Sequence, residues 1–162
     1  MLTEVAARLR SKLPAGHIAF AALISEESLL AQARGDAEAA VDLANQATAI
    51  AEASVSAGRQ GTDFLPILFM RRSEIQLQRA HYSDAAVDAR TALSLLEPSA
   101  QPSVLSSTLG RAYLMLGRVL DAQGKRAEAR VALRSAVENF ESSMGAEHSL
   151  TRVVAQKDLT GP

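Results

Sequence analysis

Residues 113–136 read YLMLGRVLDAQGKRAEARVALRSA, and this stretch decides the fold that we predict. It contains two segments with helical periodicity, separated at Gly124, and an isolated glycine between such segments is typical of a turn. Apolar residues return every three or four positions, so each segment has one face that can pack against a neighbour. The stretch therefore predicts two helices joined by a short turn.

The start of the second of these helices occurs twice more in the chain. Ala129 aligns with Ala85 and with Ala40, at spacings of 44 and 45 residues. An apolar stripe at helical spacing follows each of the three alanines. A fixed period in the range of about 20–50 residues predicts a solenoid, in which each helix pair stacks on the next.

Turn residues divide the remainder of the chain into segments of similar length. We expect helices near residues 2–13, 17–34, 36–57, 63–80, 83–97, 103–123, 126–144 and 148–157. Asp36, Ser83 and Ser103 are expected to cap helices, because a short side-chain oxygen accepts from the free amides of a first turn. His17 and His148 lie 131 residues apart, close to three periods, so a partial repeat is expected at each end.

The composition favours helices and excludes several classes of protein. Of the 162 residues 31 are alanine, the best helix former, and none is cysteine, so disulfides and thiolate ligands are excluded. The 17 basic and 18 acidic residues argue against a surface for nucleic acid or acidic membrane. With no long apolar run and no signal-peptide core, we expect a soluble, cytoplasmic protein.

At this point the sequence resembles the tetratricopeptide repeat (TPR) family. The residues that follow the family's pattern of aromatic, Leu-Gly, large, turn Gly, Ala, large and Ala positions are Tyr113, Leu116, Gly117, Leu120, Gly124, Ala129, Leu133 and Ala136. In the two earlier repeats, Glu27 and Arg72 replace the family's leucine. The period is about ten residues longer than the family's usual one, which resembles the long-helix variety of kinesin light chains and bacterial signalling proteins.

The resemblance implies an all-α fold in a single domain over residues 1–162. It is a right-handed α-solenoid of about three antiparallel helix-turn-helix repeats of roughly 44 residues, with a partial repeat at each end. We place a partial repeat or cap at 2–16, repeats at 17–61, 62–102 and 103–145, a capping helix at 146–157 and a tail at 158–162. A plain four-helix bundle is the alternative fold, and it would bring the first and third repeats into contact.

In the family, the first helices of successive repeats line a concave groove for a peptide or protein. The positions implied to face that groove are Ser25, Glu26, Leu29, Gln32, Ile67, Met70, Arg71, Glu74, Gln78, Arg111, Leu114, Met115, Arg118 and Asp121. The apolar ladder Leu29, Met70, Leu114 and Met115 would hold apolar side chains of the partner, although Met70 suits burial against a neighbouring helix as well.

The charged residues of this groove allow two interpretations. Arg71 and Arg118 are suited to bind a carboxylate or phosphate of the partner, since a guanidinium donates two parallel hydrogen bonds. In the alternative, they pair along their own helices with Glu74 and Asp121, three residues away. Separately, Glu27 and Arg72 occupy equivalent positions in adjacent first helices, so we expect them to pair across the two repeats.

We therefore predict a non-catalytic scaffold that binds a protein or peptide through this groove, in a bacterial signalling or regulatory setting. His17, His81 and His148 are far apart in sequence and are expected to be linker or cap residues. No phosphate-binding loop, catalytic triad or metal-ligand spacing is present, so we expect no enzyme, no metal and no cofactor. The alternative function is structural self-association through apolar end residues, namely Leu2, Val5, Leu9, Leu150, Val153 and Val154.

Overall fold

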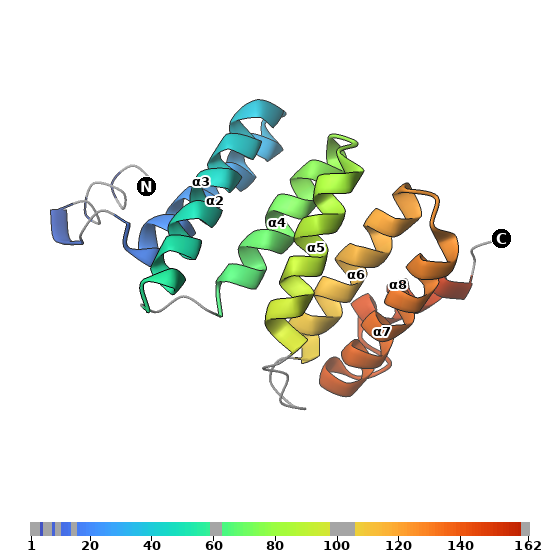
Figure 1. The fold of residues 1–162 in the computed structure, drawn as a ribbon. Helices are drawn as coiled ribbons and strands as arrows, with labels where there is room; N and C mark the ends of the chain where they lie inside the picture. Colours follow the sequence, from blue (N-terminus) through green and yellow to red (C-terminus); the bar gives the residue numbers. More distant parts are fainter. Residues whose placement is uncertain are drawn as a thin grey trace. The chain divides into compact units, whose positions relative to one another are not determined.

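The chain is all-helical over the residues that the computed structural model describes, which are 4, 8, 11–13, 16–58, 63–97 and 106–159. Seven helices lie in this part of the chain (Figure 1). They are α2 (Ile18–Ala33), α3 (Ala37–Ser56), α4 (Leu65–Gln78), α5 (Tyr82–Leu96), α6 (Ser106–Ala122), α7 (Arg126–Met144) and α8 (Ser149–Leu159). None of them combines the length and the apolar composition that a membrane crossing requires.

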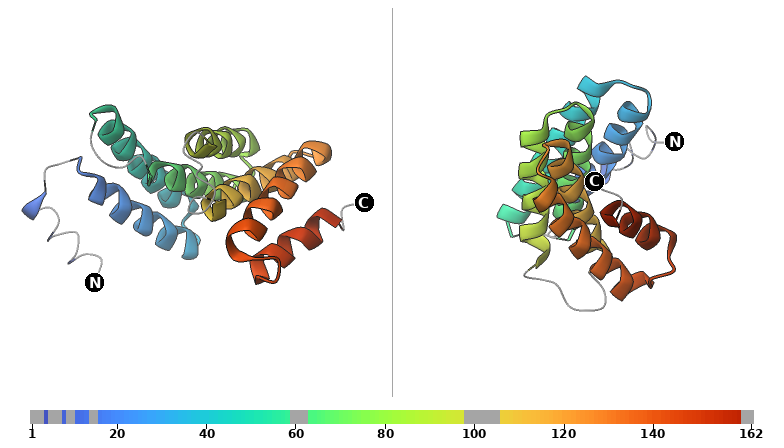
Figure 2. Two further views of the ribbon diagram at one scale, coloured as in Figure 1. Left: turned by 90° about the horizontal axis from the view of Figure 1, so that it is seen from below. Right: turned by 90° about the vertical axis from the view of Figure 1, so that its right-hand side faces the viewer.

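The chain divides into two compact units, Met1–Ile75 and Gln76–Pro162. In the first unit, α2 and α3 pack as an antiparallel pair, and Ile75 of α4 packs against Ala40 and Ala44 of α3. In the second unit, α5 packs on α6, α6 on α7 and α7 on α8 (Figures 1 and 2). Packing inside each unit thus runs between helices that follow one another along the chain.

The predicted helices are confirmed wherever the structure describes them, and their ends differ by at most three residues. Asp36 caps α3, where its Oδ1 accepts from the Ala39 amide at 3.1 Å. The predicted cap at Ser83 is wrong, because α5 begins one residue earlier and His81 holds the cap position. Of the predicted helix at 2–13 the structure describes only residues 4, 8 and 11–13, and Ser103 lies outside the described residues.

The three turns that join α2 to α3, α4 to α5 and α6 to α7 share one backbone conformation. Gly35, Ala80 and Gly124 occupy equivalent positions and have positive φ angles of 80°, 60° and 76°. In each turn the next amide bonds to a carbonyl five residues back: Asp36 to Ala31 at 3.0 Å, His81 to Gln76 at 2.9 Å and Lys125 to Leu120 at 2.9 Å. This is the Schellman ending of a helix, so the sequence period corresponds to a repeated local structure.

His17 and His148, which are 131 residues apart, make the same kind of contact at the start of a helix. Nδ1 of His17 accepts from the Ala19 amide at 3.2 Å at the start of α2. Nδ1 of His148 accepts from the Leu150 amide at 3.3 Å at the start of α8. Both side chains therefore satisfy a free amide of a helix's first turn, which confirms that these histidines are cap residues.

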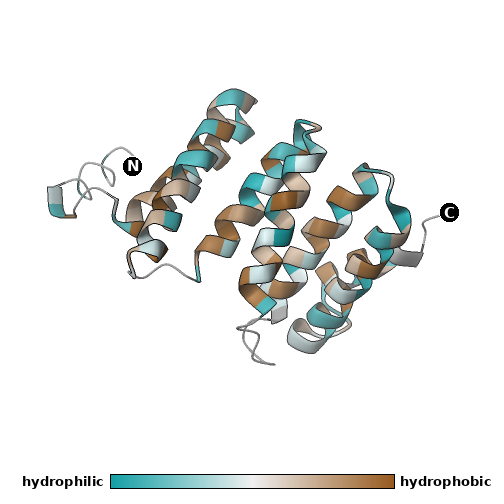
Figure 3. Ribbon diagram, viewed as in Figure 1, coloured by the Kyte–Doolittle hydropathy of each residue, from teal (hydrophilic) through white to brown (hydrophobic). Residues whose placement is uncertain are grey.

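The core is built largely from alanine on the second helix of each pair. Apolar and polar residues alternate at helical spacing along the helices, as the colouring of Figure 3 shows. The alanines that are at most 6% exposed on these helices are Ala40, Ala44, Ala47 and Ala51 on α3, Ala85, Ala86, Ala89 and Ala92 on α5, and Ala129, Ala132 and Ala136 on α7. Such small side chains allow the helices to approach closely, and larger residues such as Phe140 fill the remaining space.

Candidate functional site

The predicted groove residues of α2 and α4 lie partly at the surface. Glu26 and Gln78 are exposed, and Leu29, Gln32, Ile67, Met70, Arg71 and Glu74 are half-buried. Leu29 and Gln32 follow Ser25 at steps of four and seven residues, so these three share a face of α2. Met70 is neither fully buried nor fully exposed, which leaves a partly accessible apolar surface at this position.

Arg71 of α4 joins the two helices of this surface. Its Nη1 atom donates to Glu26 Oε1 at 2.9 Å and to Ser25 Oγ at 2.6 Å. Ser25 is 3% exposed, whereas the side chains of Arg71 and Glu26 are 29% and 53% exposed. The ion pair predicted for Arg71 within the chain was with Glu74 of its own helix, but the observed one joins two helices at equivalent positions.

The cross-helix ion pair predicted from the sequence, Glu27 with Arg72, lies one position along both helices from the observed pair of Glu26 with Arg71. Arg72, the predicted partner of Glu27, donates from Nη1 to Asn45 Oδ1 of α3 at 3.4 Å. Its guanidinium also lies 5.3 Å from the centre of the Phe69 ring, within cation–π distance. Pairing of Glu27 with Arg72 stays a prediction.

On α6, one predicted groove residue is not at the surface. Met115 is 5% exposed and packs against Ala85, Ala86 and Ala89 of α5, beside Val119 on the next turn of its own helix. Its assignment to an exposed apolar ladder is therefore wrong: Met115 lies on the face of α6 that contacts α5. The other predicted residues of this helix are accessible: Leu114 is half-buried, and Arg111, Arg118 and Asp121 are exposed.

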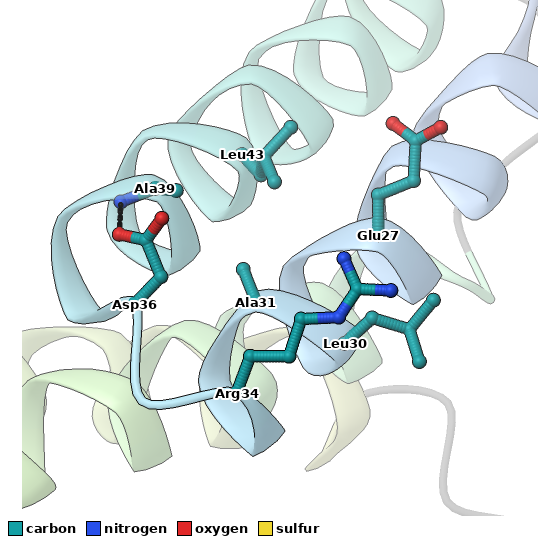
Figure 4. Close-up of a pocket in the computed structure, with 7 residues that line it drawn as sticks. All are labelled: Glu27, Leu30, Ala31, Arg34, Asp36, Ala39 and Leu43. Carbon is teal, nitrogen blue, oxygen red and sulfur yellow. Dashed lines mark hydrogen bonds between the residues drawn. The ribbon is translucent and has the colours of Figure 1, made fainter.

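The α2–α3 pair carries a depression that was not predicted from the sequence. It has a volume of about 420 Å³ and is lined by Glu27, Leu30, Ala31, Arg34, Asp36, Ala39 and Leu43 (Figure 4). Leu30, which lies near the end of α2, is 41% exposed. The sequence shows only that Leu30 is equivalent to Ile75 and Val119, and the structure adds that those two residues are 2% and 0% exposed.

Tyr113 is half-buried, and its hydroxyl donates to Glu97 Oε1 at 2.8 Å. Burial raises the pKa of Tyr113 to about 12, and the hydrogen bond and negative charge of Glu97 act in the same direction. Its ring packs in the cluster around Phe140. Tyr113 thus packs in the core, and its hydroxyl is held as a neutral donor.

The described residues bring no three potential metal ligands together. Of the end residues considered for self-association, Val153 is 52% exposed, but Val154 is 1% exposed and packs with Phe140. Leu150 packs against the same cluster, whereas Leu2, Val5 and Leu9 lie outside the described residues. Val154 is therefore unavailable to a second chain in this fold, because α8 buries it against α7.

In comparisons with known proteins, no family model and no curated protein matches this chain. The chain is consequently described by its structure, an all-helical protein whose helices pack in sequential antiparallel pairs.

Proposed function

We propose that this chain is a non-catalytic, TPR-like interaction module that binds a protein or peptide on the surface formed by α2 and α4. The observation that carries the proposal is the contact of Arg71 with Glu26 and Ser25, which brings predicted groove positions of two helices onto one surface. In this proposal the repeats stack as a solenoid, and the first helices line its concave side.

In this proposal the contact of Arg71 with Glu26 and Ser25 contributes more to recognition of the ligand than to stability of the fold. A partly exposed ion pair stabilises a fold by only about 0–1 kcal/mol, because solvent screens it. The ion pair fixes the position of the Arg71 guanidinium. Among the described residues, Glu26 and Ser25 accept from its Nη1 atom and not from Nη2 or Nε. The donors on Nη2 and Nε are then oriented for an incoming carboxylate or phosphate.

The residues around Arg71 define the kind of peptide that fits. Leu29 and Met70 offer half-buried apolar area, and methionine adapts its shape to different partners. Gln32 and Glu74 add polar groups at the next helical step. We therefore propose a ligand that carries an acidic group within a few residues of an apolar side chain.

A random peptide library displayed on phage tests this proposal. Selection against the chain is expected to enrich peptides with an acidic residue near an apolar one, and Arg71→Glu is expected to abolish their binding. Arg126→Glu is the matched control, because it makes the same charge change at an exposed residue of α7.

A charge swap separates recognition from structure. The double variant Glu26→Arg/Arg71→Glu restores an ion pair between the helices but reverses the charge offered to the ligand. If the selected peptides bind the double variant as well as the original chain, Arg71 does not contact the ligand. Equal binding by the original chain and Arg71→Glu would contradict the proposed surface.

A further inference from the structure

The depression on α2 and α3 includes Leu30, whose equivalents on α4 and α6 are each covered by the helix that precedes them in the chain. Leu30 on α2 is equivalent to Ile75 on α4 and to Val119 on α6. Ile75 is 2% exposed and packs on Ala40 and Ala44, with Val41 beside it. Val119 is 0% exposed and packs with Ala85, Ala86 and Ala89. At both of these positions the cover is a helix with alanines four residues apart.

Leu30 differs because it is 41% exposed and lines a depression of about 420 Å³. Figure 4 shows Ala31 on α2 facing the side where Ala39 and Leu43 lie on α3, whereas the Leu30 side chain points away from α3 in this view. The surface that elsewhere receives a helix is here left accessible, with an apolar floor and charged residues at its rim. The rim carries Glu27, Arg34 and Asp36, and Asp36 is engaged in capping α3.

We propose that this depression is a docking site for a helix of a partner protein, with small residues at positions i and i+4 and a lysine or arginine at i+5. The small residues follow from Ala40 and Ala44, and from Ala85 and Ala89, which cover the equivalent positions. A larger residue there would hold the incoming helix away from Leu30 and Ala31.

The basic residue follows from the polar contact next to the covered position. Arg72 is equivalent to Glu27, and it reaches Asn45, the residue that follows Ala44 on the covering helix. At the equivalent position on α2 the charge is reversed: Arg72 donates a hydrogen bond to the covering helix, whereas the carboxylate of Glu27 would accept one. A cation directly after the second small residue therefore completes the contact.

This docking site shares no residue with the surface of α2 and α4 that we propose for peptides. The two proposals can fail independently, since Arg71→Glu and Leu30→Arg change different surfaces. The partner is a helix that packs its length along the pair, whereas the other surface would take an acidic peptide.

The chain's own α3 supplies a probe of the required chemistry. A labelled peptide that copies residues 36–56 with Asn45→Lys is titrated with the full chain, and binding is followed by fluorescence anisotropy. We expect saturable binding that weakens about tenfold or more in Leu30→Arg, because one buried leucine contact is lost. Ala39→Arg at the rim is a second blocking variant. Val87→Arg is the matched control, because Val87 is a 62% exposed valine on α5.

A charge exchange tests the predicted basic residue. The Glu27→Lys variant is expected to bind the lysine peptide several-fold more weakly than the original chain does. It is expected to bind a peptide with Asn45→Glu more tightly. Circular dichroism of each variant verifies that its helix content is unchanged.

Three results would overturn the proposal. The first is equal binding of the peptide by the original chain and both blocking variants. The second is binding that occurs only after residues 1–16 are removed, because this chain's own segment would then occupy the depression. The third is a dimer in sedimentation velocity that Leu30→Arg dissociates, because the occupant would then be a second copy.

Discussion

The α2–α3 pair and the α6–α7 pair pack two helices together with different side chains at equivalent positions. Ala21 and Ala51 in the first pair are equivalent to Gly110 and Phe140 in the other, 89 residues later, and the two alanines and Phe140 are each 0% exposed. A Cβ atom on Gly110 would lie 2.8 Å from Cδ1 and Cε1 of the Phe140 ring. Phenylalanine is thus accommodated by glycine, where the α2–α3 pair uses two alanines of intermediate size.

A second position of the two pairs shows a related exchange. Ser28 of α2 donates from Oγ to the Ala40 carbonyl oxygen at 2.7 Å. The equivalent residue of α6 is Gly117, whose added Cβ would lie 2.9 Å from Leu133 and 3.4 Å from the Ala129 carbonyl. In the α2–α3 pair a buried hydrogen bond joins the helices, whereas in the α6–α7 pair a leucine fills the same space. Similar backbones are therefore stabilised by different interactions, and substitutions should affect them differently.

Phe140→Ala is expected to have the largest effect. Phe140 is fully buried among Tyr113, Leu133 and Val154, and truncating such a residue costs about 3–5 kcal/mol, because it creates a cavity. Hydrogen exchange should show the loss of protection in α6, α7 and α8. Ala51→Gly in α3 is the comparison variant, and it should cost only about 1 kcal/mol. Equal losses in the two variants would contradict the contrast between the pairs.

Gly110→Ala is expected to have the next largest effect, and its sign should depend on residue 140. In the original chain the new methyl group meets the Phe140 ring, and overpacking of this kind costs about 1–3 kcal/mol. In a Phe140→Ala background the same substitution reproduces the Ala21–Ala51 combination. There it should stabilise by up to about 1 kcal/mol, the gain in helix propensity over glycine. A double-mutant cycle measured by urea unfolding reports this coupling, and additive effects would exclude the size compensation.

The local structure was largely predictable from the sequence, because the signals for it are local. Periodicity and single glycines located the helices, and Asp36 was assigned as a cap from its place before a helix. The surfaces were less predictable, because they depend on which face of a helix meets its neighbour. Met115 was assigned to a groove but packs on α5, and the cross-helix ion pair forms at Glu26 and Arg71. The depression at Leu30 required the packing of Ile75 and Val119 for comparison.

Ser28→Ala tests the hydrogen bond that distinguishes the α2–α3 pair. The substitution removes the donor to the Ala40 carbonyl, and a net intramolecular hydrogen bond contributes about 1 kcal/mol. The expected result is a loss of that size in the free energy of unfolding, with lower protection of α2 and α3 amides from exchange. Ser94→Ala serves as the control, because the Ser94 hydroxyl bonds to a carbonyl of its own helix at an exposed position. A loss in the control as large as in Ser28→Ala would show that the cross-helix bond is not special.

At one of the turns a substitution is expected to raise the free energy of unfolding, not to lower it. Gly35 and Gly124 adopt positive φ without strain, whereas Ala80 adopts the same conformation at φ 60° despite its Cβ atom. Ala80→Gly should relieve that strain and stabilise the chain by roughly 1 kcal/mol or less, since glycine also makes the unfolded state more flexible. Gly124→Ala should destabilise it. An unchanged or lower midpoint of urea unfolding for Ala80→Gly would show that the turn carries no strain.

At neutral pH the smallest expected effect concerns Tyr113, which replaces the Ile24 of the α2–α3 pair. Because burial and Glu97 raise its pKa to about 12, the folded chain keeps this hydroxyl protonated above pH 10, where an unfolded tyrosine ionises. Its contribution to stability is therefore complete below pH 10 and is lost as the pH rises from 10 to 12. The chain has two tyrosines, so Tyr82→Phe isolates the phenolate absorbance of Tyr113 near 295 nm. Glu97→Gln should lower the titration midpoint while circular dichroism shows intact helices. A midpoint near 10 in the Tyr82→Phe chain would mean that Tyr113 is solvated, and that the cluster around Phe140 is open on this side.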